Sequence, residues 1–462
     1  MTAFDVVIVG ARCAGASLGV YLRRAGLSVA LLDASPLPSD QPMSTHLVQP
    51  PGMDELDALG VGDRVRALTP ALSSGRFEFD GRAMTLRYGA GRSAHCLRRA
   101  ALDGLLQQAA IDAGADLRPE SRVIGLLRAR DGRVAGVEVR RAGGGSDRLS
   151  ARVVVGADGR HSTVARLVGA EEYLGYDGPR ATYWAYWRRP TGWDPALFYN
   201  SFAADHSRVL FPADGDCVLI ASAPPVETAA AWRGDHRAAY LADVRSFAPL
   251  ADLLGADEPL DHVRGLLKTR YFFRAAAGAG WALAGDAGHH KEFVIGLGIS
   301  DALRDARELA QAIVKDSDAA LRRYWRKRDV ERIEMFYWGR ALARADRVTA
   351  LERLVADRVA EAPEIAARFG PVIDGRMSPY QLFPPGRVVP WVAAAALRGE
   401  VGALGALGAV AADAVRVRIE LGRRKRLLAA TEHEVRATRA CVGARAPQAP
   451  PGSAIAAAAA RL

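Results

Sequence analysis

The chain has 462 residues, half of them hydrophobic, which is enough for a large core divided into two or three subdomains. The net charge is +10, but nearly all of the basic residues are Arg interspersed with Asp and Glu, which argues against a nucleic-acid-binding protein. The four Cys residues lie far apart and without metal-ligand spacing, so neither disulfides nor a metal site are expected.

The sequence also predicts a cytoplasmic location. It opens directly on a strand pattern, with no basic segment and cleavage site of a signal peptide. No uncharged apolar run reaches about 18 residues, so no integral membrane segment is expected, and the best candidate, 401–412, is too short. Two dense basic groups, at 322–328 and 423–426, fit solvated helix faces better than a patch for an acidic partner or for membrane headgroups.

The first 33 residues predict a strand, a turn, a helix and a second strand. Residues 4–9 form a β-branched apolar run, typical of a strand buried in a parallel sheet. Small residues follow in the turn Gly10-Ala11-Arg12-Cys13-Ala14-Gly15 and open a helix that Gly26 ends. Residues 27–32 are again apolar, and Asp33 stands at the carboxyl end of that strand.

This unit has the chemistry of a dinucleotide site. Turn glycines let the backbone approach a pyrophosphate, whose charge is bound by the unpaired amides of a helix N-terminus. An acid after the second strand accepts hydrogen bonds from ribose hydroxyls, the expected role of Asp33. Arg12 replaces the middle Gly of the G-x-G-x-x-G pattern, but its guanidinium can point outward or bind phosphate directly. The alternative is an ordinary βαβ unit with a small-residue turn.

Further elements follow from turn signals and periodicity. Asp80-Gly81 and Asp131-Gly132 each separate two short apolar runs and predict β-hairpins. An amphipathic helix is expected over 99–113. Residues 171–274 are rich in aromatics in short alternating runs, which predicts an inserted, mostly antiparallel sheet.

The predicted fold class is therefore α/β: a Rossmann-like nucleotide-binding domain, an inserted, mostly antiparallel β-sheet domain that binds the substrate, and a helical C-terminal region. The expected limits are 1–75, 92–170 and 276–350 for the first domain, 76–91 and 171–275 for the second, 351–440 for the helical region and 441–462 for a disordered tail. The role of residues 388–440 is left open.

Three strand-turn segments share one sequence pattern. They are 10–15, 156–162 and 285–298, and each places small residues and an acid or a helix start after an apolar strand. The carboxyl ends of parallel strands meet at one edge of a sheet, where ligands bind. The three segments are thus expected to hold one long ligand with a pyrophosphate, a sugar or ribityl chain, and a ring. Only one full dinucleotide turn is present.

On these three motifs, residues 1 to about 350 resemble the flavin-dependent monooxygenases of the para-hydroxybenzoate hydroxylase type and the wider group with geranylgeranyl reductases and flavin halogenases. The resemblance implies FAD as cofactor. It places the FAD pyrophosphate at the first turn and the ribityl chain at Asp286, and it links Asp158 to both FAD and NAD(P)H. The helix that begins near Gly298 would face the flavin pyrimidine. The implied cofactor-binding residues are Gly10, Arg12, Ala14, Gly15, Asp33, Arg99, Val123, Asp158, Gly159, Asp286, Gly296 and Gly298.

Other site assignments follow less directly. Phe293 stands where the family has Pro near the reactive edge of the flavin, which makes oxygenation less secure than FAD binding. Tyr186 and Phe293 are expected to contact the substrate. His46, in the loop after Asp33, is the candidate catalytic base or hydrogen-bond donor, with a structural role as the alternative. The halogenase and reductase motifs are incomplete, which disfavours halogenation.

The expected activity is that of an FAD-dependent, NAD(P)H-using monooxygenase that hydroxylates an aromatic or polyketide-like small molecule through a flavin hydroperoxide, with molecular oxygen as co-substrate. A reductase of isoprenoid double bonds is the alternative enzyme. A flavin-binding protein without turnover is the alternative from another class. NADH or NADPH preference, oligomeric state and covalent attachment of FAD stay open.

Overall fold

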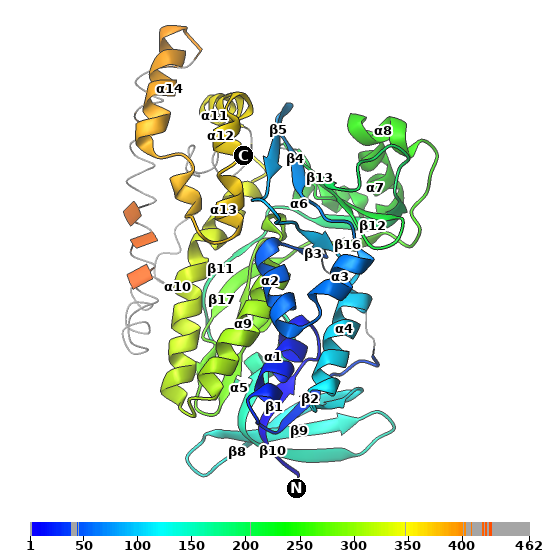
Figure 1. Cartoon of the computed structure of the whole chain (residues 1–462), viewed down its shortest axis with the longest axis vertical. Helices are drawn as coiled ribbons and strands as arrows, with labels where there is room; N and C mark the ends of the chain where they lie inside the picture. The colour runs from blue at the N-terminus through cyan, green and yellow to red at the C-terminus, as the bar shows by residue number, and fades with distance from the viewer. Residues whose placement is uncertain are drawn as a thin grey trace. The chain divides into compact units, whose positions relative to one another are not determined.

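The computed structural model describes residues 2–37, 44, 46–203, 205–346 and 348–400, with a few single positions beyond 400 (Figure 1). The predicted tail, 441–462, lies outside these residues. The chain divides into two compact units. The first comprises Met1–Leu68, Leu97–Tyr176 and Arg270–Asp329; the second comprises Thr69–Cys96, Asp177–Thr269 and the described residues from Val330 onward. The first unit ends at Asp329, inside the long helix α10 (Asp318–Leu342). The sequence predicts the end of the first domain at residue 350, which is 21 residues later.

The first unit is built on a sheet with strand order β18-β19-β10-β1-β2-β7, in which β19, β10, β1, β2 and β7 are mutually parallel. Its strands are β1 (Thr2–Val9), β2 (Val29–Leu32), β7 (Asp116–Arg118), β10 (Ser146–Gly156), β18 (Ala277–Gly278) and β19 (Trp281–Leu283). Val6, Val7 and Ile8 of β1 have no exposed surface, which confirms a strand buried on both faces. The predicted hairpin at Asp131-Gly132 is confirmed as β8 (Ser121–Arg128) with β9 (Val134–Arg141).

Helices cover this sheet. The central one is α1 (Cys13–Arg24), which packs against α9 (Gly298–Ile313) and α4 (Arg99–Asp112). The remaining helices of the unit are α2 (Pro50–Leu59), α3 (Gly62–Leu68) and α5 (Thr163–Val168). A smaller sheet joins β11 (Glu172–Asp177), β17 (Arg270–Arg274) and β20 (His289–His290). The predicted helix over 99–113 is confirmed as α4.

The second unit holds a sheet of order β16-β12-β15-β14-β13-β4-β5, antiparallel except for the β4–β13 pair, as predicted. Its strands are β4 (Ser74–Phe79), β5 (Arg82–Arg87), β12 (Thr182–Arg188), β13 (Leu197–Phe202), β14 (Ser207–Pro212), β15 (Cys217–Ser222) and β16 (Arg264–Leu266). One face packs on α7 (His236–Arg245) and α8 (Ala248–Leu254), drawn in green in Figure 1. The short strand β6 (His95–Cys96) also belongs to this unit, whereas the short strand β3 (Leu47–Val48) belongs to the first.

The helical region of the second unit contains α6 (Val226–Ala230), α11 (Ala350–Glu361), α12 (Pro363–Ala366), α13 (Phe369–Ile373) and α14 (Pro385–Leu397). Helices α11, α12 and α13 pack against β5. Among the described residues, no helix has the length and apolar character needed to cross a membrane.

Two glycines allow the first turn to close against the sheet. Gly10 has φ +101°, and a Cβ there would lie 2.4 Å from the carbonyl oxygen of Ala157 in the neighbouring turn. A Cβ on Gly15 would lie 1.8 Å from the carbonyl oxygen of Gly10. A side chain at Gly10 or Gly15 would therefore collide with a backbone carbonyl, which cannot move aside as a flexible side chain could. Gly15 sets how closely α1 approaches β1.

We predict that Gly15→Ala lowers the free energy of unfolding by about 1–3 kcal/mol, the usual cost of overpacking a rigid site. Gly19→Ala, one turn further along α1, is the matched control, because its added Cβ would meet only atoms at 3.7 Å or beyond. The control should be neutral or stabilising by up to about 1 kcal/mol from helix propensity. Denaturant titration measures both, and equal effects of the two substitutions would contradict the steric argument.

Candidate functional site

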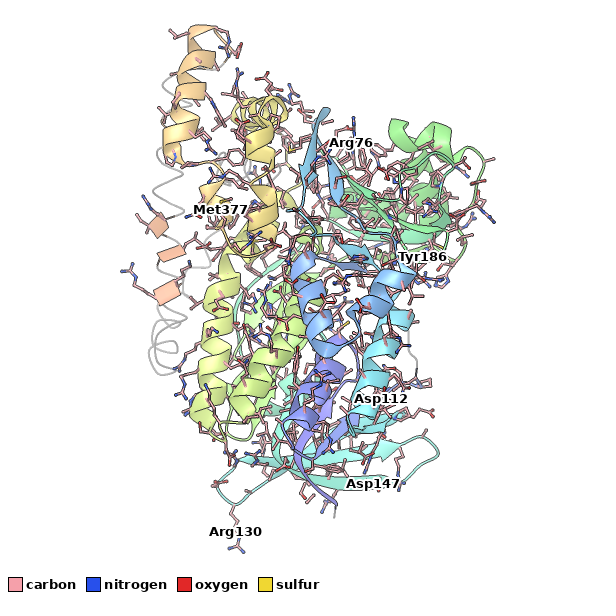
Figure 2. All side chains as sticks on the ribbon, viewed as in Figure 1. Arg76, Asp112, Arg130, Asp147, Tyr186 and Met377 are labelled. Atoms are coloured by element: carbon pink, nitrogen blue, oxygen red, sulfur yellow. The ribbon has the colours of Figure 1, made fainter. Side chains whose placement is uncertain are left out.

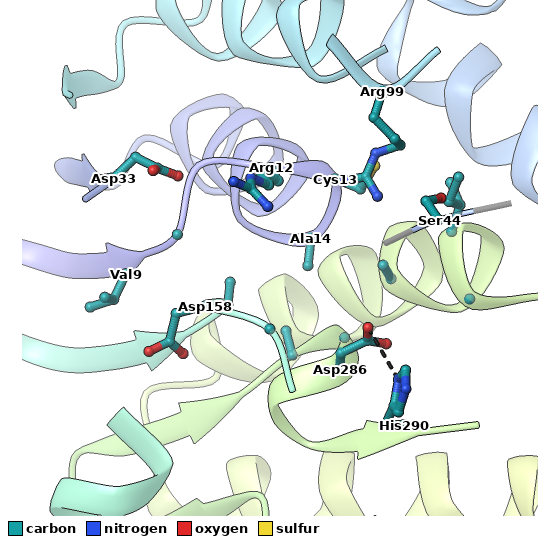
Figure 3. Close-up of a pocket in the computed structure, with 18 of the residues that line it drawn as sticks. Val9, Arg12, Cys13, Ala14, Asp33, Ser44, Arg99, Asp158, Asp286 and His290 are labelled. Carbon is teal, nitrogen blue, oxygen red and sulfur yellow. Dashed lines mark ion pairs between the residues drawn. The ribbon is translucent and has the colours of Figure 1, made fainter. Parts of the chain in front are cut away.

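Three turns meet at the carboxyl edge of the parallel sheet. The amide of Gly10 donates to Leu32 O at 2.7 Å, that of Ala157 to Val9 O at 2.7 Å, and that of Ala284 to Gly156 O at 2.9 Å. Each turn is thus fixed to the end of the adjacent strand. They surround a cavity of about 330 Å³ in the first unit (Figure 3). The predicted convergence of the three segments is confirmed.

Asp33 fixes the first turn. Its Oδ2 accepts from the amide of Ala11 and its Oδ1 from the amide of Ser35, both at 2.9 Å. Gln107 donates to Ala11 O at 2.9 Å and holds the turn from the other side. Arg12 stands at the N-cap of α1 in an extended conformation and lines the cavity, as do Asp33 and Ala14.

A buried cation lies beside this turn. Arg99, the first residue of α4, donates through Nη2 to both carboxylate oxygens of Asp103, at 3.0 and 2.9 Å. Burial acts to lower the pKa of Arg99, but Asp103 outweighs it and the net pKa is raised. Cys13 Sγ donates to the same carboxylate at 3.2 Å, and burial raises the pKa of Cys13, which therefore stays a thiol. Figure 3 shows Arg99 reaching toward Cys13 on the cavity wall.

The second turn is organised by a helix cap. Asp158 Oδ2 accepts from the amides of Thr163 at 2.7 Å and Val164 at 3.2 Å, and its Oδ1 accepts from Ser162 Oγ. Burial raises the pKa of Asp158 against these hydrogen bonds, which act to lower it. The carboxylate is thus engaged with α5. Beside it Gly159 has φ +77°, a conformation that favours glycine, and both residues line the cavity.

The third turn presents a carboxylate to the cavity. Asp286 lies in the short 3-10 helix Gly285–Ala287 with its side chain 43% exposed, and His290 Nδ1 lies 3.2 Å from its Oδ2 (Figure 3). Burial acts to raise the pKa of Asp286, but His290, His289 and Arg99 outweigh it and hold the pKa below its ordinary value. Asp286 is therefore ionised at neutral pH.

A cluster of buried charged side chains packs against this turn. Asp305 Oδ2 accepts from the amide of Gly285 at 3.1 Å and lies 3.7 Å from Arg328 Nη1. One turn before it on α9, Asp301 pairs with Lys291. Arg328, Asp305, Asp301 and Lys291 all have side chains at most 6% exposed. The sequence analysis missed this cluster, although acids four residues apart on the apolar face of a helix were a signal for it.

The predicted catalytic and substrate residues and Gly15 lie as follows. His46 is buried, with φ +59°, and is not among the cavity-lining residues, whereas Ser44 and Leu47 are. Gly15 serves the packing of α1 and does not line the cavity. Tyr186 lies in β12 of the second unit (Figure 2). Phe293 lines the cavity at the start of a 3-10 helix. The sequence missed the lining residues Ser121, Arg122, Lys291 and Glu292.

All of the remaining predicted cofactor residues line the cavity: Gly10, Arg12, Ala14, Asp33, Arg99, Val123, Asp158, Gly159, Asp286, Gly296 and Gly298. The described residues contain no group of three or more His, Cys, Asp or Glu side chains that could hold a metal ion. The cavity suits a long ligand with a central pyrophosphate. It offers a helix N-terminus behind a glycine turn and two nearby Arg side chains for the pyrophosphate, and separate acids at each end.

Comparison with known proteins agrees with this chemistry. Residues 3–193 match the FAD binding domain family. The 6-methylpretetramide 4-monooxygenase of Streptomyces rimosus is 29% identical over 326 residues, 65% of this chain and 73% of that protein. Digeranylgeranylglycerophospholipid reductase 2 of Methanothermobacter thermautotrophicus is 32% identical over 173 residues, but the match spans only 42% of that protein.

Solved structures show the same fold. The flavin-dependent brominase Bmp2 superposes with a TM-score of 0.68 at 16% identity, covering 86% of this chain and 99% of that one. PqsL, a probable FAD-dependent monooxygenase from Pseudomonas aeruginosa, gives a TM-score of 0.65 at 20% identity, covering 78% and 99%. The site and fold together define an FAD-binding α/β oxidoreductase. Residues 3–193 are thus similar to FAD binding domains and the chain is similar to a monooxygenase over 326 residues, and FAD is its cofactor.

His289 yields a prediction for acid stability. Its side chain is 2% exposed, and burial, with Arg328 and Lys291 nearby, lowers its pKa to about 3 although Asp301 acts to raise it. The unfolded chain takes up this proton near pH 6.5. The unfolded state thus binds more protons between pH 6.5 and 3, so stability falls as the pH drops through that window. His289→Gln should lose less melting temperature than the wild type between pH 7 and 4.

The control for this prediction is His262→Gln, at an exposed position in the second unit. It should show the same loss of melting temperature with pH as the wild type. If the melting temperature of His289→Gln falls with pH as steeply as that of the wild type, the acid sensitivity arises from other groups.

Proposed function

We propose that the protein is an NAD(P)H-dependent monooxygenase that hydroxylates an aromatic or polyketide-like small molecule with molecular oxygen. The observation that carries the proposal is the cavity at the sheet edge, with cations beside the first turn and the partly exposed carboxylate of Asp286 at the third. The similarity to a monooxygenase named for a pretetramide substrate supports the choice of substrate class. NAD(P)H as reductant also favours the cytoplasm as its place of action.

Our assignment of the cavity begins with the adenosine half of FAD. The amides at the start of α1 bind the pyrophosphate, and Arg12 and Arg99 supply positive charge beside it. Asp33 binds the adenosine ribose. Its two oxygens already accept one amide each, but a carboxylate offers about four lone-pair sites and so can accept ribose hydroxyls as well. Val123 packs near the adenine.

The flavin half lies at the third turn. Asp286 binds hydroxyls of the ribityl chain, and the N-terminus of α9, at Gly296 and Gly298, faces the pyrimidine ring. A helix N-terminus stabilises negative charge, which the flavin gains on reduction. Bound FAD supplies the redox and oxygen chemistry. The protein orients the ring and excludes water from it. NAD(P)H would bind transiently and supply the reducing equivalents, and Asp158-Gly159 would lie on its path.

Three residues complete the proposed reaction site. Phe293 and Tyr186 contact the substrate, and Phe293 occupies the cavity wall beside Gly296. His46 is the weakest assignment, because it is buried and does not line the cavity. A base acting on the substrate must reach it, so His46 would serve only after movement of its loop.

A second candidate function is favoured by one observation. A protein named as a digeranylgeranylglycerophospholipid reductase is 32% identical over 173 residues. A reductase of isoprenoid double bonds would use reduced flavin without oxygen. Saturation of a prenyl substrate under anaerobic conditions would support it. A protein that binds flavin without turnover is the remaining alternative, and Phe293 at the family's Pro position keeps it open.

We predict that Asp286→Ala weakens FAD binding about tenfold or more, because a charge-assisted hydrogen bond to the ribityl chain is lost. Fluorescence titration of the apoprotein with FAD measures the dissociation constant. Asp112→Ala is the control: this acid is exposed near the end of α4 and lies outside the cavity (Figure 2), so FAD affinity should not change. Unchanged affinity in Asp286→Ala removes our assignment of that acid.

We further predict that NADH or NADPH bleaches the yellow FAD-loaded protein under anaerobic conditions, and that an aromatic substrate accelerates the reduction. Air then restores the flavin and yields hydroxylated product in proportion to the oxygen consumed. Stopped-flow absorbance and product mass spectrometry measure the two steps. Flavin that stays oxidised with both nucleotides and every ligand would contradict the monooxygenase and favour a binding protein.

A further inference from the structure

Lys291 and Asp301 form a buried ion pair at the third turn. Lys291 Nζ pairs with Asp301 Oδ2, and the two side chains are 4% and 6% exposed. Lys291 directly follows β20 and lines the cavity, whereas Asp301 does not line it. The pair therefore directs its positive end toward the cavity and its negative end away from it. The assignment of FAD to the cavity uses neither side chain.

Asp301 lies in the first turn of α9, where an acid has two opposite effects. It stabilises the helix, because its charge offsets the positive end of the helix dipole. The same charge weakens the positive field that the start of α9 directs at the cavity through Gly298, which is among the lining residues. A ligand that gains negative charge beside this helix start is therefore stabilised less, unless Asp301 is neutralised.

Lys291 supplies this neutralisation. His289 Nε2 lies 3.9 Å from Asp301 Oδ2, but burial, with Arg328 and Lys291, lowers the pKa of His289 to about 3, so its ring carries no charge at neutral pH. Arg328 Nη1 lies 3.7 Å from Asp305 Oδ2 and balances that acid. Buried charges interact more strongly than charges in water, so the state of the Lys291–Asp301 pair affects any charge that forms in the cavity.

We propose that the Lys291–Asp301 pair raises the reduction potential of the bound flavin. Lys291 is a positioning residue: it cancels the charge of the acid on α9 and keeps the positive end of the pair at the cavity wall. The inference rests on the proposed function, which assigns the flavin half of FAD to the third turn and the start of α9. FAD takes up the electrons, whereas the pair itself transfers neither an electron nor a proton.

The alternative is that the pair is a structural anchor without an electrostatic effect on the flavin. It joins the segment after β20 to α9, so its loss would loosen both. The two roles predict different results. An anchor is lost equally when either partner is removed, whereas the effect of a charge changes sign according to which partner remains.

The test measures the midpoint potential of the FAD-loaded protein by anaerobic chemical reduction against a reference dye, without NAD(P)H, substrate or oxygen. Lys291→Met leaves the carboxylate of Asp301 uncompensated, so reduction should become about tenfold less favourable, a fall of about 30 mV for a two-electron couple. Asp301→Asn leaves the ammonium group and should raise the potential by a similar amount. The double variant should lie between the two single variants and below the wild type, because it loses the orientation of the pair but leaves no net charge.

Each single variant leaves a buried charge without its partner and can therefore fail to fold. The double variant avoids that cost, and Lys291→Arg keeps the positive charge. If the single variants do not fold, the double variant must still have a lower potential than the wild type, and Lys291→Arg must have the wild-type potential.

Arg307→Met is the matched control. Arg307 lies further along α9, does not line the cavity, and pairs with Glu55 of α2 at 2.9 Å. Its substitution makes the same change in charge on the same side of the molecule's sequence as Lys291→Met, but away from the site. The midpoint potential of Arg307→Met should therefore equal that of the wild type, even if its melting temperature falls.

A potential that falls in both single variants, or that does not fall in Lys291→Met, would overturn the proposal and leave the pair as an anchor. A double variant with a potential above the wild type would do the same. The dissociation constant of oxidised FAD and the yield of hydroxylated product are measured separately. Normal FAD binding and turnover with unchanged potentials would thus reject the role of the pair and leave the proposed function standing.

Discussion

The cavity depends on the parallel pairing of β1 with β10 and of β10 with β19. These strands are separated by more than a hundred residues in the sequence, yet their carboxyl ends lie side by side because each is hydrogen-bonded in the same direction. Every element of the cofactor site follows from that alignment. The glycine turn, the Asp158 cap and the Asp286 turn are each an extension of one strand, and none of them forms the cavity alone.

Much of this was predictable from local signals. The strand at 4–9, the turn glycines, the two hairpins and the α9 helix are encoded by apolar periodicity and turn residues over short windows, and the motif order indicated that their ends converge. Asp158 shows the limit of such inference. Its sequence context predicts a ligand-binding acid, and the residue does line the cavity, but its carboxylate also caps α5 through Ser162 and two amides, which the sequence did not indicate.

Other features could not be read from the sequence, because they join residues without a shared local pattern. The pairing of Lys291 with Asp301 and of Arg328 with Asp305 depends on how β20, α9 and α10 pack. His46 shows a different limit: its place in a loop after Asp33 suggested access to the ligand, whereas the structure has a positive φ there and a buried side chain.

The charged cluster beneath Gly285 has a consequence for how the protein can change. Removing one member of a buried ion pair leaves the other uncompensated, which costs far more than replacing the whole group by apolar side chains of similar volume. Lys291, Asp301, Asp305 and Arg328 therefore vary at low cost only in concert, because single exchanges pass through states with an isolated charge. The turn that presents Asp286 thus rests on a buried charged cluster whose members are expected to change together and not one at a time.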